Sequence, residues 1–397
     1  MKRSSLFILL CIFTFPVFAQ NLWVQRTDFA DTAVYDAVGF SIGTKGYIGT
    51  GNDFYWGLHN DFWEYDPGVD SWTQKATFPG GKREFAIGFS IGSKGYLGTG
   101  HLGSSVYVDD FWEYDPGINL WTQKANIPGG TRSSAVGFSI GAKGYILFGN
   151  GGVDFWEYDT TLNSWTAKST FPGLPRPQAI AFVVVNKAYV GLGDWFNAHQ
   201  NDIWQYDQMS DTWSQKAYLP GPTRRGAVAF AIGNKGYVGT GFDSLGSPHE
   251  DFWEYNTTND SWTQVANHGG GFVWDAVAFS IGGRGYVGTG APPLPPPTSQ
   301  FWEYSPLTTI PENKSHNLSI AIYPNPIISN ATIEIENDFS IPALFELYDL
   351  KGFKVQEFPI MERLSLFQKN DLKSGIYFYK IIDQNNKSAS GKMIIRD

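Results

Sequence analysis

The chain has 397 residues, of which 16% are aromatic and only 17% are charged, and 45 are glycine. This composition favours many short strands joined by tight turns, and it argues against a helical or a disordered protein. The formal net charge of −9 and the lack of any basic run argue against nucleic acid as a partner.

The first 19 residues have the features of a secretory signal peptide. Lys2 and Arg3 form the charged start, residues 6–13 the apolar core, and residues 17–19 a small-residue cleavage site. The apolar run is too short to span a bilayer, which disfavours the alternative of a membrane anchor, so we expect no transmembrane segment. The only cysteine, Cys11, lies in this segment. The mature chain must therefore be held by packing and strand pairing without disulfides.

A six-residue pattern recurs through most of the chain. It reads Asp-Phe-Trp-Glu-Tyr-Asp at residues 61–66, and five exact or varied copies follow at steps of 44 to 49 residues, beginning at Asp110, Asp154, Asp202, Asp251 and Gln300. A fixed period of this size indicates an array of identical supersecondary units. One unit has strand-like segments at residues 86–91, 96–99 and 111–114 and a fourth from Trp121, with glycine in the turns. Four antiparallel strands per unit is the plan of a propeller blade.

These repeats resemble the Kelch family over residues 22–304. The resemblance rests on the period of about 50 residues and on an aromatic-Tyr-Asp strand followed by tryptophan. One departure is that the paired glycines usual after the second Kelch strand appear mostly as Gly-Thr-Gly, at residues 49–51, 98–100 and 239–241.

The number of blades follows from comparing the copies of the six-residue pattern with the tryptophans of the fourth strands. The six-residue pattern occurs six times, and so does the tryptophan of the fourth strand, at Trp23, Trp72, Trp121, Trp165, Trp213 and Trp262. The series are offset, because Trp23 has no pattern before it and the copy at 300–305 has no tryptophan after it. We therefore predict an all-β fold in which residues 20–305 form a six-bladed Kelch-type β-propeller. The N-terminal strand joins the last blade and closes the ring.

The remaining residues form a second unit. We expect a linker at residues 306–317 and a small β-sandwich at residues 318–397, with strands at residues 331–336, 344–348, 375–382 and 392–395. Four motifs, at residues 323–326, 347–352, 374–377 and 392–395, resemble the C-terminal sorting domain of the type IX secretion system. The resemblance implies a Bacteroidota-type cell, the type IX secretion machinery as a partner, and a secreted or outer-membrane surface location. The alternative is an immunoglobulin-like adhesion module.

A glutamate recurs at one position of the blade, which favours a structural role over catalysis. Catalysis needs one carboxylate in a singular environment, whereas these copies are equivalent and spread round a ring. Cations three residues after the fourth-strand tryptophan lie on the neighbouring strand, so we predict cross-strand ion pairs. The glutamates are Glu64, Glu113, Glu157, Glu254 and Glu303, and the cations are Arg26, Lys75, Lys124, Lys168 and Lys216.

Functional residues are expected in the loops that vary from blade to blade. The connections between second and third strands and those between fourth and first strands should share one rim. Arginine, histidine and exposed aromatic groups there suit a polar, anionic or sugar-like ligand. The alternative is that the arginines satisfy carbonyls of the next blade and that the histidines are ordinary loop residues. The candidate ligand-binding residues are Arg83, Arg132, Arg176, Arg224, His59, His101, His199, His249, Trp56, Trp195 and Trp274.

The sequence contains no recognisable catalytic or metal motif. Copper radical chemistry of the galactose-oxidase type needs a cysteine, which the mature chain lacks, and the sialidase aspartate box is not found. We expect no metal site and no cofactor, because the four histidines come from different blades without supporting ligands. At the level of fold the chain also resembles six-bladed Kelch proteins that isomerise sialic acid.

Two hypotheses of function follow. The first is a non-catalytic, monomeric binding module, secreted or on the cell surface, for a glycan or protein ligand. The alternative is a carbohydrate-active enzyme, an epimerase or a lyase, in which one of the four arginines holds a carboxylate sugar and a rim histidine acts as base.

Overall fold

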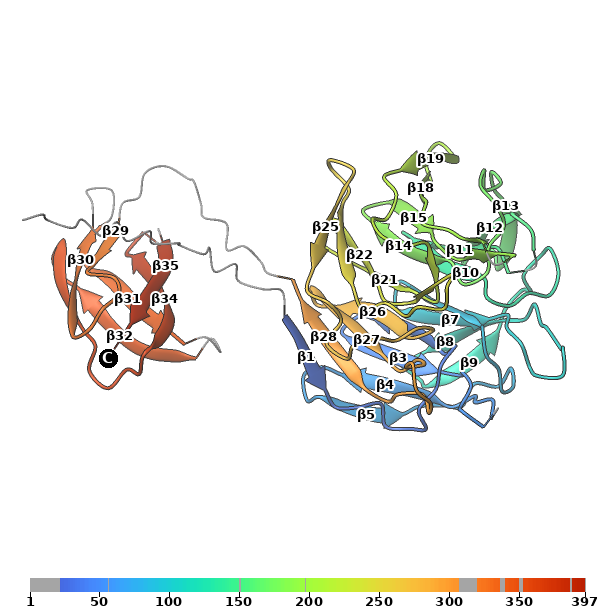
Figure 1. Ribbon diagram of the computed structural model, residues 1–397, viewed down its shortest axis with the longest axis horizontal. Helices are drawn as coiled ribbons and strands as arrows, with labels where there is room; N and C mark the ends of the chain where they lie inside the picture. Colours follow the sequence, from blue (N-terminus) through green and yellow to red (C-terminus); the bar gives the residue numbers. More distant parts are fainter. Residues whose placement is uncertain are drawn as a thin grey trace, which may run out of the picture. The chain divides into compact units, whose positions relative to one another are not determined.

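A computed structural model describes residues 22–306 and 320–396, except residues 56, 150, 197, 336–339, 350–352 and 386–387. The chain divides into two compact units, Met1–Leu307 and Thr308–Asp397 (Figure 1). The predicted signal peptide and nearly all of the predicted linker lie outside the described residues. Within the described ranges, no helix is long and apolar enough to cross a bilayer.

The first unit consists of six four-stranded antiparallel sheets, which confirms the predicted fold class. The second blade is typical, with its strands hydrogen-bonded in chain order. Its strands are β6 (Ile87–Ile91), β7 (Lys94–Gly98), β8 (Phe111–Asp115) and β9 (Leu120–Gln123). The second strand begins two residues earlier than predicted, because Lys94 pairs with Ile91 and only two residues form the hairpin turn.

Four other blades repeat this order. Blade 1 has β2 (Val38–Ile42), β3 (Lys45–Gly49), β4 (Phe62–Asp66) and β5 (Ser71–Gln74). Blade 3 has β10 (Val136–Ile140), β11 (Lys143–Leu147), β12 (Phe155–Asp159) and β13 (Ser164–Ala167). Blade 4 has β14 (Ile180–Val184), β15 (Lys187–Gly191), β18 (Ile203–Asp207) and β19 (Thr212–Lys216). Blade 5 has β21 (Val228–Ile232), β22 (Lys235–Gly239), β24 (Phe252–Asn256) and β25 (Ser261–Val265).

The sixth blade closes the ring as predicted. It combines β26 (Val277–Ile281), β27 (Arg284–Gly288) and β28 (Phe301–Ser305) with the N-terminal strand β1 (Leu22–Arg26), in which Trp23 lies opposite Tyr304. The indole nitrogen of Trp23 donates to the carbonyl of Ala266 at 3.1 Å. The same bond ties the fourth strand to the preceding blade elsewhere, as from Trp121 to Ala76 at 2.9 Å. The N-terminal strand therefore has the same role as every internal fourth strand.

Close packing between blades depends on glycine in the second strands. A Cβ atom added at Gly95 would lie 2.5 Å from the ring of Phe40 in the preceding blade, so only glycine lets that ring lie against the strand. The predicted cross-strand pairs also form within the blades. Lys124 lies 3.2 Å from Glu113, which also accepts a hydrogen bond from Tyr96 at 2.6 Å. The repeated glutamates are thus held by a tyrosine and a cation.

The second unit contains two packed sheets. One has the order β29 (Ile320–Tyr323), β30 (Asn330–Ile335), β33 (Leu364–Gln368), and the other β32 (Lys354–Ile360), β31 (Ala343–Tyr348), β34 (Gly375–Asp383), β35 (Ser388–Ile395). Phe345, Phe367, Ile381 and Met393 are among the residues of the buried core between them. The sequence pattern predicted the positions of β30, β31, β34 and β35 but missed β29, β32 and β33.

Candidate functional site at the mouth of the propeller channel

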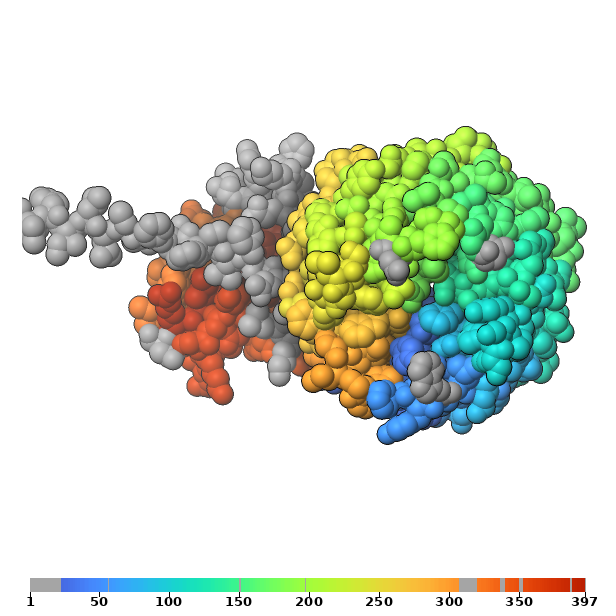
Figure 2. All heavy atoms as spheres, turned by 45° about the vertical axis from the view of Figure 1, so that its right-hand side comes forward, coloured from blue at the N-terminus to red at the C-terminus, as the bar shows by residue number. Residues whose placement is uncertain are grey.

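The first strands of the six blades surround a narrow channel. Its wall is made of small and aliphatic side chains, mostly alanine, glycine, valine and isoleucine, from β2, β6, β10, β14, β21 and β26. The side chains of this wall carry no polar groups, so hydrogen bonds to a ligand could come only from the backbone. Figure 2 shows the propeller with its blades following one another around the centre in the order of the colour bar. The polar groups lie where the first strands begin.

Six residues form a ring at one mouth of the channel. Each lies two positions before a first strand, has a positive φ between 51° and 62°, and is followed by alanine. Backbone N–H groups donate to the carbonyl of the preceding blade, for example from Phe85 to Asp36 at 3.1 Å and from Asp36 to Asp275 at 3.0 Å. We call these residues the mouth ring: Asp36, Phe85, Ser134, Gln178, Gly226 and Asp275.

The mouth ring repeats in backbone but not in side chain. Its residues line a cavity of about 160 Å³. The amide of Gln178 in blade 4 donates to the carboxylate of Asp275 in blade 6 at 2.8 Å. Gly226 of the intervening blade makes this possible, because a Cβ atom there would lie 2.7 Å from an oxygen of Asp275. Repetition of the fold therefore positions five different residue types at six equivalent places around one opening.

The carboxyl groups of Asp36 and Asp275 in the mouth ring are neighbours and are both shielded from water. Burial raises the pKa of Asp275 to about 7, and the charge of Arg225 partly opposes this shift. Burial also raises the pKa of Asp36 well above its usual range, and the neighbouring charge of Asp275 raises it further. Near neutral pH the pair therefore retains protons, so that it can both donate and accept hydrogen bonds.

A second acidic group lies just outside the mouth ring. Glu84 is buried and accepts hydrogen bonds from the amide of Asn52 at 2.6 Å and from Nδ1 of His101 at 2.8 Å. The ring of Tyr107 stacks on His101 with centroids 5.0 Å apart. This arrangement fixes the orientation of the imidazole, which belongs to the set of predicted site residues.

The opposite side of the mouth carries a cation among aromatic rings. Arg225 lies 3.5 Å from the carboxylate of Asp194, and its guanidinium lies 4.8 Å from the centre of the Phe242 ring. Trp274 packs edge-on against Phe242 at 5.5 Å. Among the described residues of the mouth, this one guanidinium faces the carboxyl groups of Asp36, Glu84, Asp194 and Asp275. Even with Asp36 and Asp275 protonated, the carboxylates of Glu84 and Asp194 outnumber this guanidinium, which disfavours an anionic ligand.

The four predicted arginines have structural positions. Their side chains are 0 to 1% exposed, and each pairs with the acidic residue that opens the six-residue pattern of the same blade. Arg83 shows the arrangement, because it contacts Asp110 at 2.7 Å, the carbonyl of Thr99 at 2.7 Å and the carbonyl of Gly80. Arg132, Arg176 and Arg224 pair in the same way with Asp154, Asp202 and Asp251. Enclosed groups with all these partners have no free face for a ligand, so we leave them out of the site.

The predicted histidines divide into two groups. His59 and His249 each lie 3.2 Å from an aspartate of their own loop, Asp53 and Asp243, whose other oxygen accepts backbone N–H groups of that loop. These two organise their loops. His199 is buried near Asp194, and burial lowers its pKa, so that it adjoins the mouth as a neutral ring.

The predicted tryptophans differ in position. Trp274 belongs to the mouth, and Trp195 packs edge-on against the exposed Phe196 at 4.4 Å in the short hairpin of β16 (Asp194–Trp195) and β17 (Ala198–His199). Trp56 lies outside the described residues. The structure thus brings together Trp274, His101 and His199 with the mouth-ring residues.

The sequence-based prediction did not include the mouth ring or its neighbours Glu84, Asp194 and Arg225. A signal was present in the aligned repeats. The position directly before the constant alanine holds five different residue types in six copies. The position three residues before that alanine, by contrast, is arginine in four of the six copies. Variation at a structurally fixed position would have identified the ring.

The fold and the terminal domain define a class, the exported six-bladed β-propeller with a C-terminal sorting domain. Residues 321–396 match the family model described as "Secretion system C-terminal sorting domain". This match confirms the predicted sorting domain, which implies the secretion machinery as a partner and indicates export to the cell surface or the extracellular space.

A solved structure described as "Structure of YjhT" is similar to the chain with a TM-score of 0.62 and 15% identity, over 72% of this chain and 98% of that chain. At this identity the likeness shows the fold alone. No curated protein sequence matches the chain.

Proposed function

We propose that the propeller is a non-catalytic binding module that holds a glycan at the mouth of its channel. The observation that carries the proposal is the mouth ring, in which one repeated backbone position presents five different residue types. Residues that only build the fold are repeated from blade to blade, so variation at a fixed position is the expected trace of selection for a ligand.

The chemistry of the mouth favours a sugar. The carboxyl groups of Asp36 and Asp275 and the amide of Gln178 suit hydroxyl groups, which donate and accept hydrogen bonds. Phe85 and Trp274 are half-buried aromatic rings against which the C–H face of a sugar can pack. A concave opening of this size fits a glycan end better than the flat surface of a folded protein.

The charge of the mouth narrows the class of glycan. Even with Asp36 and Asp275 protonated, the carboxylates of Glu84 and Asp194 outnumber the single guanidinium among the described mouth residues, so an anionic sugar would be repelled. We therefore propose a neutral or amino sugar as the ligand. This differs from the anionic ligand that the arginines had suggested.

A glycan array probed with the full chain tests the proposal. We expect binding to neutral or amino glycans, at least tenfold weaker in Asp275→Asn and in Trp274→Ala. Gln264→Ala, an exposed substitution on the outermost strand of blade 5, is the matched control and should leave binding unchanged. Binding restricted to acidic glycans, or binding that survives both mouth substitutions, would contradict the proposal.

A second candidate, an enzyme acting on a bound sugar, rests on one observation. A carboxyl group with a pKa near 7 is suited to general acid–base catalysis at neutral pH, and Asp275 is such a group. The version that used a buried arginine to hold a carboxylate sugar has no support, because those guanidiniums are occupied. Incubating the sugars found on the array with the protein and following their anomers and epimers by NMR separates catalysis from binding. Conversion that Asp275→Asn abolishes would favour the enzyme.

A further inference from the structure

Blade 6 departs from the other blades at a buried position in the connection that leads to its first strand. Five blades have an apolar residue there, and each donates its backbone N–H to the residue before the six-residue pattern of the preceding blade; these are Phe29, Phe78, Ile127, Phe171 and Leu219. His268 makes the same backbone bond, to Glu250 at 2.7 Å, and is only 7% exposed. A polar ring has therefore replaced an apolar side chain without any change of backbone.

Two further replacements surround this histidine. Val273 stands where blades 2 to 5 have the buried arginine, and Gln300 stands where they have its aspartate partner. The ion pair that fills this space elsewhere is thus missing. Blade 1 also has valine at the arginine position. There, however, the carboxylate of Asp31 lies close to the third strand and accepts a hydrogen bond from the indole nitrogen of Trp63 at 3.0 Å. Among the described blades, blade 6 alone has no acidic side chain in this space.

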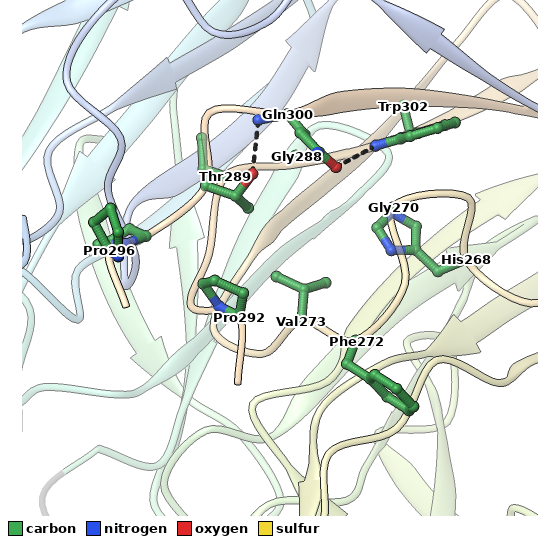
Figure 3. Close-up of a pocket in the computed structure, with 12 residues that line it drawn as sticks. His268, Gly270, Phe272, Val273, Gly288, Thr289, Pro292, Pro296, Gln300 and Trp302 are labelled. Atoms are coloured by element: carbon green, nitrogen blue, oxygen red, sulfur yellow. Dashed lines mark hydrogen bonds between the residues drawn. The ribbon is translucent and has the colours of Figure 1, made fainter. Parts of the chain in front are cut away.

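The missing ion pair leaves a pocket of about 320 Å³ between the 268–273 turn and the proline-rich 291–300 loop (Figure 3). This volume is at the lower end of the range for small-molecule sites. Gly270 lies close to the polar wall, since a Cβ atom there would be 2.7 Å from the indole nitrogen of Trp302 and 3.0 Å from the amide oxygen of Gln300. Pro292 and Pro296 form the apolar side.

The pocket contains hydrogen-bond acceptors that an arginine would fill in another blade. Nδ1 of His268 lies 3.0 Å from the carbonyl of Gly271, so it must carry the proton, which leaves Nε2 as an acceptor. Nε2 is enclosed and has no partner. The carbonyls of Gly270 and Thr289 lack the arginine donor that Gly80 and Thr99 receive in blade 2.

The unfilled acceptors, the lack of an acidic side chain and the apolar walls of the pocket together favour one class of ligand. Unfilled acceptors require a ligand with hydrogen-bond donors. A guanidinium could donate, but with the aspartate replaced by glutamine it would be buried without a counter-charge. Burial also keeps His268 neutral, because it lowers the pKa of the ring to about 4. A neutral ligand with hydroxyl groups and an apolar face satisfies both the acceptors and the walls.

We propose that the pocket between the 268–273 turn and the 291–300 loop of blade 6 binds one ring of a neutral sugar, with a hydroxyl group donating to an acceptor of its polar wall beside His268. The site is distinct from the mouth ring and does not depend on the function proposed for it.

Titration of the full chain, with its histidines labelled with ¹⁵N, against glucose, galactose and N-acetylglucosamine tests this site. We expect a saturable shift of the Nε2 resonance of His268 with at least one of them. His268→Phe, which introduces the residue of blade 2, should weaken binding by at least tenfold. The double variant Val273→Arg, Gln300→Asp rebuilds the ion pair and should abolish binding while retaining the fold.

Asp275→Asn is the control for the mouth and should leave this titration unchanged, whereas the double variant should leave binding at the mouth unchanged. The two proposals can therefore fail separately. The absence of a shift with all three sugars, binding that persists in the double variant, or tighter binding of guanidinium than of the sugars would overturn the proposal.

Discussion

The Asp36–Asp275 pair gives the folded protein a defined dependence on pH. The pKa of Asp275 rises from a usual value of 3.8 to about 7 because the carboxyl is buried. Between these values the folded state holds a proton that the unfolded chain has lost. Folding therefore takes up a proton in this window, and the contribution of this group to stability falls as the pH rises from about 4 to about 7.

Asp275→Asn should remove this dependence. Asparagine keeps an oxygen for the amide of Gln178 but carries no charge to bury. We expect the variant to be more stable than the natural protein by about 4 kcal/mol at about pH 8 and nearly equally stable at about pH 4. Urea unfolding of both proteins across this range measures the difference. A difference that stays constant with pH, or that favours the natural protein at high pH, would contradict the assignment.

The buried arginines should be among the most sensitive residues of the propeller. Arg83→Ala leaves Asp110 largely enclosed and without its cation, and it removes the donor from two carbonyls. Breaking such a pair should cost about 3–5 kcal/mol of the free energy of unfolding. The pair of Lys75 with Glu64, at 3.5 Å and with both side chains partly exposed, is the matched control, and Lys75→Ala should cost less than about 1 kcal/mol. Equal costs in chemical denaturation would show that the arginine is not structural.

At the scale of the element, the N-terminal strand is the one part of blade 6 that is distant in sequence. Five residues of β1 pair with β28, Trp23 packs against Phe252 and Tyr304, and Arg26 lies 2.9 Å from Glu303. Without β1, the strand β28 would become an open edge of a three-stranded blade. The ring would then be held only by its interblade contacts.

A mature chain that begins at Thr27 should therefore be destabilised and prone to associate through β28. We expect a lower midpoint of thermal unfolding and self-association in size-exclusion chromatography. A peptide of residues 20–27 added in trans should restore the midpoint, because it can add to the exposed edge as a strand. The same peptide with Trp23 replaced by alanine should be a weaker rescuer. A truncated chain with an unchanged midpoint would show that closure does not depend on β1.

The elements of the propeller were predictable because each blade is a copy of the others. Six aligned copies reveal the strands, the glycine turns and the offset of Trp23, so that blade number and closure followed from counting. The sorting domain has no internal copies. There β32 and β33, which carry exposed apolar residues such as Leu364 and Leu366, gave no clear alternation and were missed.

The site was less predictable because its residues meet only through the ring. Gln178 and Asp275 are 97 positions apart, and their contact depends on the missing side chain of Gly226 between them. The four arginines were predicted as site residues although they repeat from blade to blade, unlike the residues of the mouth ring. They recur at one position in four blades. Equivalent copies spread round the ring indicated a structural role for the repeated glutamates, and the same reasoning applies to these arginines.

At the scale of the whole molecule, the chain consists of two units that each have a core of their own. The buried cluster of the sorting domain draws only on residues 327–395, whereas the clusters of the propeller draw only on residues 29–304. A unit with a complete core of its own can fold alone. The propeller should therefore keep its fold, and its ligand, when the sorting domain is removed.

A chain that ends at Ser305 tests this independence. We expect it to unfold at the same temperature as the propeller transition of the full chain, and the heat absorbed by the two separate units should sum to that of the full chain in calorimetry. In cells of the native host, the same truncation should leave the folded propeller inside the outer membrane, because residues 321–396 match the sorting domain. A shifted transition would indicate that the units stabilise each other, and continued export would mean that the signal lies elsewhere in the chain.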